Sequence, residues 1–265
     1  IMLSYDSRFA FQIQPNNTRF SYPEYIHACF KALHRRNINV HIISPESDLS
    51  AYKVVIAPAL YIVDDAVSAS LQAYAENGGH LLITARSGVK DEYNVIPEMT
   101  LPTRISALCG VEVIDYDSLL PSMYVPVEFA DGTRANAEIW CDVLDLTTAT
   151  AIATYDGEFY AGQPAITRNQ VGRGTVDYAG VLGGDALIET TLSNVLSLAE
   201  IVSPFDAQPG IEVVKRGNLT FILNHAATDL TVTLNENTTD LITGKSFDNE
   251  MVLGSGDVLV LQNHT

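Results

Sequence analysis

VVIAPALYIVDDAVSASLQAYAENGGHLLITARSGVKDEYN, residues 54–94, is the stretch that decides the fold. It opens with the apolar run Val54–Ala57, which is long enough for a buried strand and short for a helix. The pair Asp64–Asp65 follows at a position typical of a helix N-terminus, where acidic side chains are favoured. The pair Gly78–Gly79 ends that helix, and a second apolar run, His80–Thr84, comes next. Strand, helix and strand in about 30 residues predict a βαβ unit with parallel, buried strands.

The residues before this unit show a similar alternation. We predict a strand over residues 1–5, a long loop over 6–20, a helix over 21–36 and a strand over 38–43. The order β-α-β-β-α-β then occupies about 85 residues. It predicts an α/β fold, a doubly wound flavodoxin-like sheet with helices on both faces.

After residue 94 the pattern changes to short runs separated by turn residues. We predict a short helix over 101–110 and a longer one over 185–201, with strands between them at 111–116, 124–129, 149–155, 164–169 and 175–181. Pairs such as Asp131–Gly132 and the triplet Gly172–Arg173–Gly174 are typical of tight turns. These strands are expected to extend or flank the sheet.

A second domain is predicted at the C-terminal end. Residues 203–210, SPFDAQPG, have the composition of a linker. Beyond them the only regular signals are short strand-like runs at 212–215, 219–224, 230–234, 239–242 and 258–261. This pattern predicts a small antiparallel β-sandwich. The predicted domains are therefore residues 1–204 and residues 205–265.

Composition excludes several classes of protein. Hydrophobic residues make up 47% and charged residues 18% of the 265, which is typical of a folded domain rather than a disordered chain. The 32 acidic residues against 15 Lys and Arg give a formal charge of −17. A surface of that sign repels nucleic acid and anionic membranes, so we expect neither as a partner.

The cysteines indicate a reducing compartment. Cys29, Cys109 and Cys141 lie far apart among apolar neighbours, so we predict reduced core residues in a cytoplasmic protein. No apolar run of 18 residues and no secretory signal occurs. Because Ile1 falls inside a predicted strand, we expect further chain upstream of it.

Motifs for metal and nucleotide binding are missing. The six histidines form neither HxH nor HExxH, and no glycine-rich phosphate loop follows the first strand. We therefore expect no metal site and no cofactor.

The loop after His80–Thr84 lies at the sheet edge where α/β proteins bind ligands. A nucleophile elbow there needs a cysteine or serine between closely spaced glycines. The sequence is Thr84–Ala85–Arg86–Ser87–Gly88, with no cysteine and no glycine two residues before Ser87. Catalysis at this loop is therefore not expected. The charged residues of the loop, with one tyrosine, mix charge and apolar surface as interface rims do, namely Arg86, Lys90, Asp91, Glu92 and Tyr93.

Residues 7–20 form the other stretch of interest. Aromatic, cationic and amide side chains gather in it, foremost Arg8, Phe9, Phe11 and Gln12. Such groups bind sugars or proteins, so one interpretation is a loop that faces a substrate or partner. The other interpretation is a loop packed on itself.

Four stretches of the chain resemble the C-terminal portion of the bacterial β-galactosidases of glycoside hydrolase family 42. They are residues 44–60, residues 78–92, residues 157–165 with 172–174, and residues 221–225 with 240–244. In that family a (β/α)8 barrel carries the acid/base and nucleophile glutamates. An amidotransferase-like trimerisation domain and a small β-domain follow the barrel.

The chain resembles only the last two of these domains. The resemblance implies that neither catalytic glutamate is in this chain, that the parent protein hydrolyses terminal β-D-galactosides, and that the chain forms a homotrimer attached to barrels. It also implies that Arg8, Phe9 and Phe11 border a neighbour's substrate cleft.

A freestanding amidotransferase-like enzyme or a carbohydrate-binding module is the alternative. The first needs the elbow cysteine that is missing. The second usually shows exposed aromatic residues, whereas Trp140 is the only tryptophan and the predicted second domain has few aromatic rings.

Overall fold

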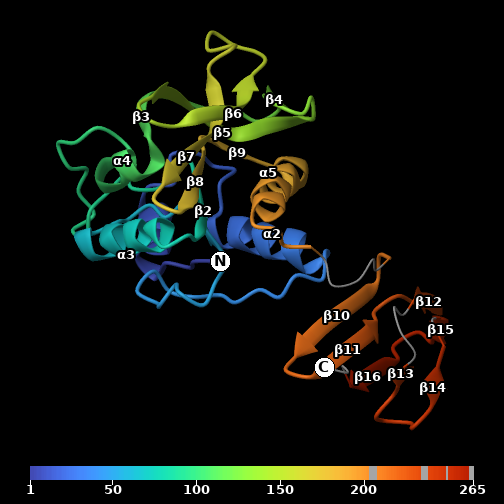
Figure 1. The fold of residues 1–265 in the computed structure, drawn as a ribbon. Helices are drawn as coiled ribbons and strands as arrows, with labels where there is room; N and C mark the ends of the chain where they lie inside the picture. Colours follow the sequence, from blue (N-terminus) through green and yellow to red (C-terminus); the bar gives the residue numbers. More distant parts are fainter. Residues whose placement is uncertain (203–207, 234–237, 249, 263–265) are drawn as a thin grey trace. The chain divides into compact units, whose positions relative to one another are not determined.

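The computed structural model describes residues 1–202, 208–233, 238–248 and 250–262 (Figure 1). Its contacts divide the chain into two compact units. Residues 1–30 and 41–201 form the α/β unit, and residues 31–40 and 202–265 form the β unit. The predicted boundary between residues 204 and 205, with most of the predicted linker, lies outside the described residues and stays a prediction.

The predicted βαβ element is confirmed at the centre of the α/β unit. Strands β1 (Val54–Ala57) and β2 (His80–Thr84) pair in parallel, joined by α3 (Asp65–Glu76). The Asp64 carboxylate accepts a hydrogen bond from the Val67 amide at 2.7 Å, which caps the helix as its position predicts. The buried face of α3 packs into the main apolar core through Val67, Leu71, Tyr74 and Ala75.

The sheet is mixed, with nine strands. Its order is β1-β2-β8-β7-β6-β4-β5-β3, and β9 pairs with β5. Besides β1 and β2 the strands are β3 (Val111–Ser118), β4 (Val125–Phe129), β5 (Arg134–Leu146), β6 (Thr150–Tyr155), β7 (Pro164–Val171), β8 (Gly174–Ala179) and β9 (Val181–Gly183). Only β1, β2 and β8 run parallel. The α/β class is confirmed, and the antiparallel part follows from tight turns such as that at Gly172, which join only antiparallel neighbours.

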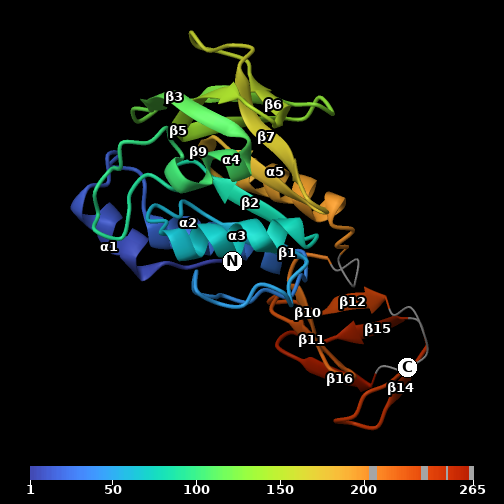
Figure 2. The ribbon, with the colours of Figure 1, turned by 60° about the vertical axis from the view of Figure 1, so that its left-hand side comes forward.

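Helices cover both faces of the parallel strands. In Figures 1 and 2, α3 lies on one side of β2 and β8, and α5 (Asp185–Leu198) lies on the other. A short turn η1 (Thr103–Ile105) and α4 (Ser106–Cys109) occupy the predicted helix at 101–110. Gly110 ends α4 in the left-handed conformation, with φ of 69°.

The N-terminal region differs from the prediction in two ways. Residues 6–20 are not one long loop, because α1 (Tyr5–Ile13) begins there, capped by the Ser4 hydroxyl, which accepts from the Ser7 amide at 3.1 Å. The predicted strands at 1–5 and 38–43 are reduced to a single bridge between Met2 and Ile43. The predicted helix at 21–36 is confirmed as α2 (Tyr22–His34).

The β unit is antiparallel, as predicted. Strands β10 (Ile211–Arg216), β11 (Leu219–Asn224) and β16 (Val258–Gln262) form one sheet. The β unit also contains two separate two-stranded sheets. One pairs β12 (Leu230–Thr233) with β15 (Glu250–Leu253), and the other pairs β13 (Thr238–Thr239) with β14 (Ser246–Phe247). Its own core contains Ile211, Val213, Ile222, Val232, Met251, Leu253, Leu259 and Leu261.

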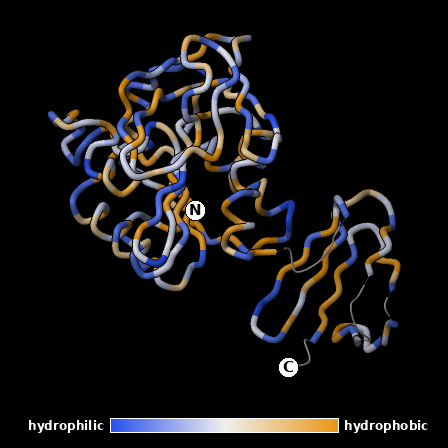
Figure 3. Tube along the Cα trace, turned by 45° about the horizontal axis from the view of Figure 1, so that its top comes forward, coloured by the Kyte–Doolittle hydropathy of each residue, from blue (hydrophilic) through white to orange (hydrophobic). Residues whose placement is uncertain are grey.

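The hydropathy of both units follows this layout. In Figure 3 hydrophobic stretches run along strands of each unit, and hydrophilic stretches lie mostly at turns and loops. Among the described residues, no helix has the length and apolar character needed to cross a membrane.

Candidate functional site

The turn after β2 has the backbone feature of a nucleophile elbow without the nucleophile. Arg86, two residues beyond the strand, has φ of 67°, which is uncommon for a residue other than glycine. The Ser87 hydroxyl is buried, donates to the Thr84 carbonyl at 2.7 Å and accepts from the Leu60 amide at 2.9 Å. Ser87 therefore braces the turn, and an arginine occupies the position at its tip.

The Arg86 side chain is buried, with 3% of its surface exposed. Its guanidinium carbon lies over four aromatic rings, those of Phe11 at 4.5 Å, Trp140 at 4.7 Å, and Phe20 and Tyr61 at 5.3 Å. Nη1 donates to the Pro15 carbonyl at 2.6 Å, whereas Nη2 has no hydrogen-bond partner among the described residues. Burial lowers the pKa of Arg86, and the neighbouring Tyr61 and Asp142 oppose that shift.

Lys90 is the second buried cation of this loop. Its ammonium group donates to Gln14 Oε1 and Asn94 Oδ1, both at 2.9 Å. Through Lys90 and Arg86, the β2 loop holds the chain between α1 and α2. Both were predicted at an interface, but in this chain neither side chain lies on the exposed surface.

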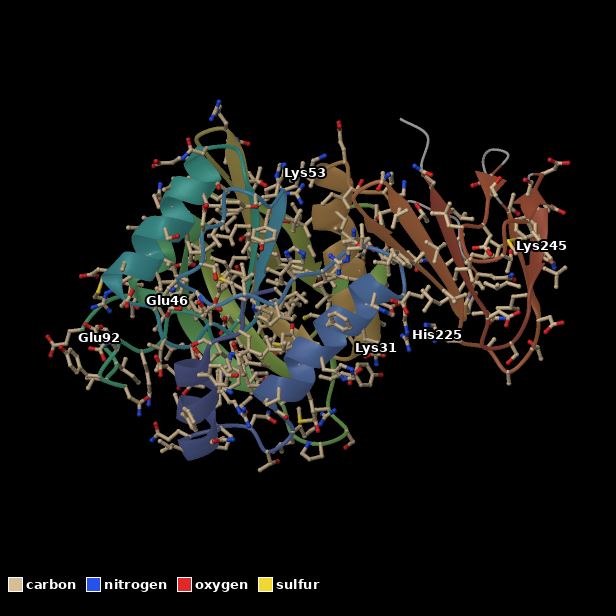
Figure 4. The ribbon with its side chains drawn as sticks, turned by 90° about the horizontal axis from the view of Figure 1, so that it is seen from below. Lys31, Glu46, Lys53, Glu92, His225 and Lys245 are labelled. Atoms are coloured by element: carbon tan, nitrogen blue, oxygen red, sulfur yellow. The ribbon has the colours of Figure 1, made fainter. Side chains whose placement is uncertain are left out.

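The remaining predicted interface residues do reach the surface. The Asp91 carboxylate accepts from the amides of Tyr93 at 3.0 Å and Val95 at 2.9 Å, which shapes the loop tip. Glu92 lies 3.9 Å from the Arg104 guanidinium, and Figure 4 shows it on the outlying loop of the α/β unit. The Tyr93 side chain is 78% exposed. An interface role for these three residues stays a prediction.

The residues predicted between positions 7 and 20 divide into two groups on α1. Phe11 is buried against Tyr61, Tyr22 and Phe20, so it belongs to the core and not to a surface loop. Arg8, Phe9 and Gln12 are exposed. A partner-facing or substrate-facing role for these three stays a prediction.

A partly open cavity of about 110 Å³ adjoins the buried arginine. Its polar and aromatic lining comes from Asn16, Tyr61, Arg86, Ser87, Tyr116, Trp140, Asp142 and Tyr178. Its apolar lining comes from Val89, Ile96, Leu101, Pro102 and Val113. The strands β3, β5 and β8 thus bring side chains to the β2 loop that sequence reasoning did not connect with it. The one available signal was Asp142, a carboxylate inside the apolar run 139–144.

The Asp142 carboxylate is buried and held by two donors. Trp140 Nε1 donates to Oδ1 and the Tyr178 hydroxyl donates to Oδ2, each at 2.8 Å. Burial raises the pKa of Asp142 to about 6, although both hydrogen bonds and the Arg86 charge favour the ionised form. The cavity therefore presents a fixed cation and a fixed carboxylate, with no nucleophile hydrogen-bonded to a base.

The three cysteine thiols are buried and are not activated as nucleophiles. Burial raises the pKa of Cys29 and Cys141 to about 12 and that of Cys109 further, so all three thiols stay protonated and unreactive at neutral pH. In the described part of the chain, no three His, Cys, Asp or Glu side chains are grouped to hold a metal ion.

Two family models match the chain. The model of the β-galactosidase trimerisation domain matches residues 1–202, and that of the β-galactosidase C-terminal domain matches residues 210–263. The β-galactosidase BgaA of Clostridium cellulovorans is 39% identical over 202 residues, 76% of this chain and 30% of that protein. The β-galactosidase BgaH of Haloferax lucentense is 32% identical over 254 residues, 95% of this chain and 38% of that protein.

Comparison with solved structures also finds β-galactosidases. The β-galactosidase of Bacillus circulans sp. alkalophilus superposes with a TM-score of 0.93 at 26% identity, over 98% of this chain and 41% of that one. The enzyme of the Antarctic haloarchaeon Halorubrum lacusprofundi gives 0.88 at 27% identity, over 100% of this chain and 39% of that one. The chain thus spans well under half the length of these relatives. It belongs to the glycoside hydrolase family 42 β-galactosidases, with a trimerisation domain at residues 1–202 and a C-terminal domain at residues 210–263.

Proposed function

We propose that this chain is the non-catalytic assembly part of an enzyme that hydrolyses terminal β-D-galactosides on a separate (β/α)8 barrel. The match of the trimerisation-domain model to residues 1–202 is the observation that carries this proposal. The unpaired cysteines favour a cytoplasmic location for the assembly.

The site geometry supports this reading over the amidotransferase alternative. An amidotransferase of this fold needs an activated thiol at the elbow, whereas Arg86 stands there. Ser87 next to it uses its hydroxyl to brace the turn, with no base in contact.

The isolated chain should not hydrolyse β-galactosides. Retaining hydrolysis needs two carboxyl groups about 5 Å apart in a sugar-binding cleft. A chromogenic galactoside, with a full-length family enzyme as positive control, tests this directly. Galactosidase activity that co-purifies with the chain through successive columns at constant specific activity would contradict the proposal.

Self-association should use the exposed apolar residues of the α/β unit. Tyr5, Phe9 and Ile13 are 64%, 57% and 71% exposed, and their spacing of four puts them on one face of α1. On the β2 loop, Tyr93 and Val95 are also exposed. Apolar surface of this kind marks contact sites, and we assign it to further copies of this chain.

A trimer is the expected form in physiological salt. The charge of −17 opposes association, and a Debye length of about 8 Å at 0.15 M ionic strength weakens that repulsion. Light scattering at low and physiological salt should show the mass rising toward three chains. Phe9→Asp should lower association at least about tenfold, by removing buried apolar area and adding charge.

The control for this variant is Phe159→Asp, at a 78% exposed phenylalanine of the β6–β7 turn. A wild-type chain that stays monomeric at tens of micromolar, in physiological salt, would show that assembly depends on the barrels.

A further inference from the structure

The cavity beside the β2 loop is lined by Arg86, a buried residue with a hydrogen-bond donor that the described residues leave unsatisfied. Arg86 is more than nine-tenths buried and lines the cavity, and its Nη2 has no hydrogen-bond partner among the residues that the structure describes. Leaving a charged donor unpaired in a desolvated place costs free energy, so such groups usually meet an acceptor. The cavity has room for several waters, or for one end of a small ligand whose remainder stays in solvent.

The charges in the cavity already balance. Asp142 lines the same cavity and is mostly ionised at neutral pH, since its pKa is about 6. Its carboxylate offsets the Arg86 charge without a direct hydrogen bond between the two being observed. A bound anion would leave a net negative charge in a desolvated site, which is unfavourable. A neutral ligand carries no such penalty.

The donors of Arg86 and the acceptors of Asp142 also restrict which neutral ligands can bind. A guanidinium only donates, and an ionised carboxylate only accepts. Each Asp142 oxygen already receives one hydrogen bond and retains capacity for another. A hydroxyl group can accept from Arg86, and a neighbouring hydroxyl can donate to Asp142.

The remaining lining is apolar and aromatic, so it favours contact with the carbon atoms of a ligand. Ile96, Leu101, Pro102 and Val113 form an apolar wall, and Tyr116 stacks on Trp140 with ring centroids 4.6 Å apart. Apolar walls with a few fixed polar groups are typical of small-molecule sites. We propose that this cavity binds a neutral polyhydroxy ligand, a monosaccharide or smaller polyol, between Arg86 and Asp142. The proposal is independent of catalysis and of oligomeric state.

The chain carries a built-in reporter for this test. Trp140 is its only tryptophan, lines the cavity and donates its indole N–H to Asp142. The 265-residue chain should therefore show a single indole N–H resonance and, when tryptophan is excited selectively over tyrosine, fluorescence from this site alone. Titration with galactose, glucose and glycerol should shift these signals saturably in the millimolar range. Sodium acetate at matched ionic strength should not.

Two isoleucines give a matched pair of variants. Ile96 lines the cavity and is 59% exposed, whereas Ile114 does not line it and is 56% exposed. Ile96→Tyr should narrow the mouth and weaken polyol binding at least about tenfold. Ile114→Tyr should leave binding within about twofold. Arg86→Lys, which removes the forked guanidinium, should also weaken binding, with circular dichroism to verify its fold.

Three outcomes would overturn the proposal. The first is acetate binding more tightly than every polyol, which would mark an anion site. The second is no saturable Trp140 response to any polyol up to several hundred millimolar. The third is equal binding by the wild-type chain and the Ile96→Tyr variant, which would place the ligand elsewhere.

Discussion

Replacing Gly174 with alanine is expected to destabilise the α/β unit by about 3 kcal/mol or more. Gly174 is the first residue of β8, where the strand begins beside β2 and the end of α3. A Cβ added there would lie inside van der Waals contact of the Gly79 carbonyl oxygen and 2.5 Å from that of Ala75. Both obstacles are backbone atoms of packed elements, so no side-chain rotation relieves the clash.

Urea denaturation of wild type and variant measures the loss in the free energy of unfolding. Gly157→Ala is the matched control, because its Cβ would meet only side-chain atoms, the Pro126 ring at 3.3 Å and Val125 Cγ1 at 4.0 Å. That change should cost no more than about 1 kcal/mol. Equal stability of the Gly174→Ala variant and the wild-type chain would show that β8 does not start where the structure places it.

The second large effect concerns the pH dependence of stability set by Asp142. Its pKa is about 6 in the folded chain and about 3.8 when unfolded, so the native state holds the proton more tightly. Its contribution to stability is therefore fully present below about pH 3.8 and is lost as the pH rises through about 6. Between the two ends of this pH range, the stabilisation that Asp142 provides changes by about 3 kcal/mol, since each unit of pKa difference corresponds to 1.36 kcal/mol.

Asp142→Asn removes this titration and keeps the shape of the side chain. An amide can still accept from Trp140 and pair with the Tyr178 hydroxyl. Because the isoelectric point is about 4.5, measurements from pH 5 to 8 avoid precipitation. As the pH rises from 5 to 8, the free energy of unfolding of the wild-type chain should fall by about 1.4 kcal/mol relative to that of the variant.

Urea denaturation at each pH gives this difference. Asp145→Asn, at an exposed position on the same strand, is the control and should track the wild-type chain. A wild-type minus Asp142→Asn difference that does not change between pH 5 and 8 would contradict burial of a titrating carboxyl in this cavity.

Local sequence signals accounted for much of the fold. The apolar runs at Val54–Ala57 and His80–Thr84, with the Asp64 cap between them, predicted the parallel pair that centres the sheet. Short alternating runs likewise predicted the antiparallel β unit. These features depend on residues within one turn or one strand of each other, so a local pattern contains them.

Helix α1 and strand β5 escaped this reasoning for identifiable causes. Helix α1 shows no clear apolar periodicity, because Phe11 faces the core while Tyr5, Phe9 and Ile13 face outward. Strand β5 passes through both exposed and buried surroundings over 13 residues, which breaks a simple alternation. In each case the tertiary environment, not the local pattern, decides which side chains are buried.

The sequence by itself determined the α/β and β classes, the family resemblance and the absence of an elbow cysteine. Only the tertiary structure decided that Arg86 and Lys90 are buried and that Asp142 and Trp140 share a cavity with Arg86. Arg86 is separated by 71 residues from its hydrogen-bond partner Pro15 and by more than 50 from Trp140. The composition of a loop shows that it carries charged side chains. Whether those side chains are buried or exposed to solvent depends on strands and helices that are distant in the sequence.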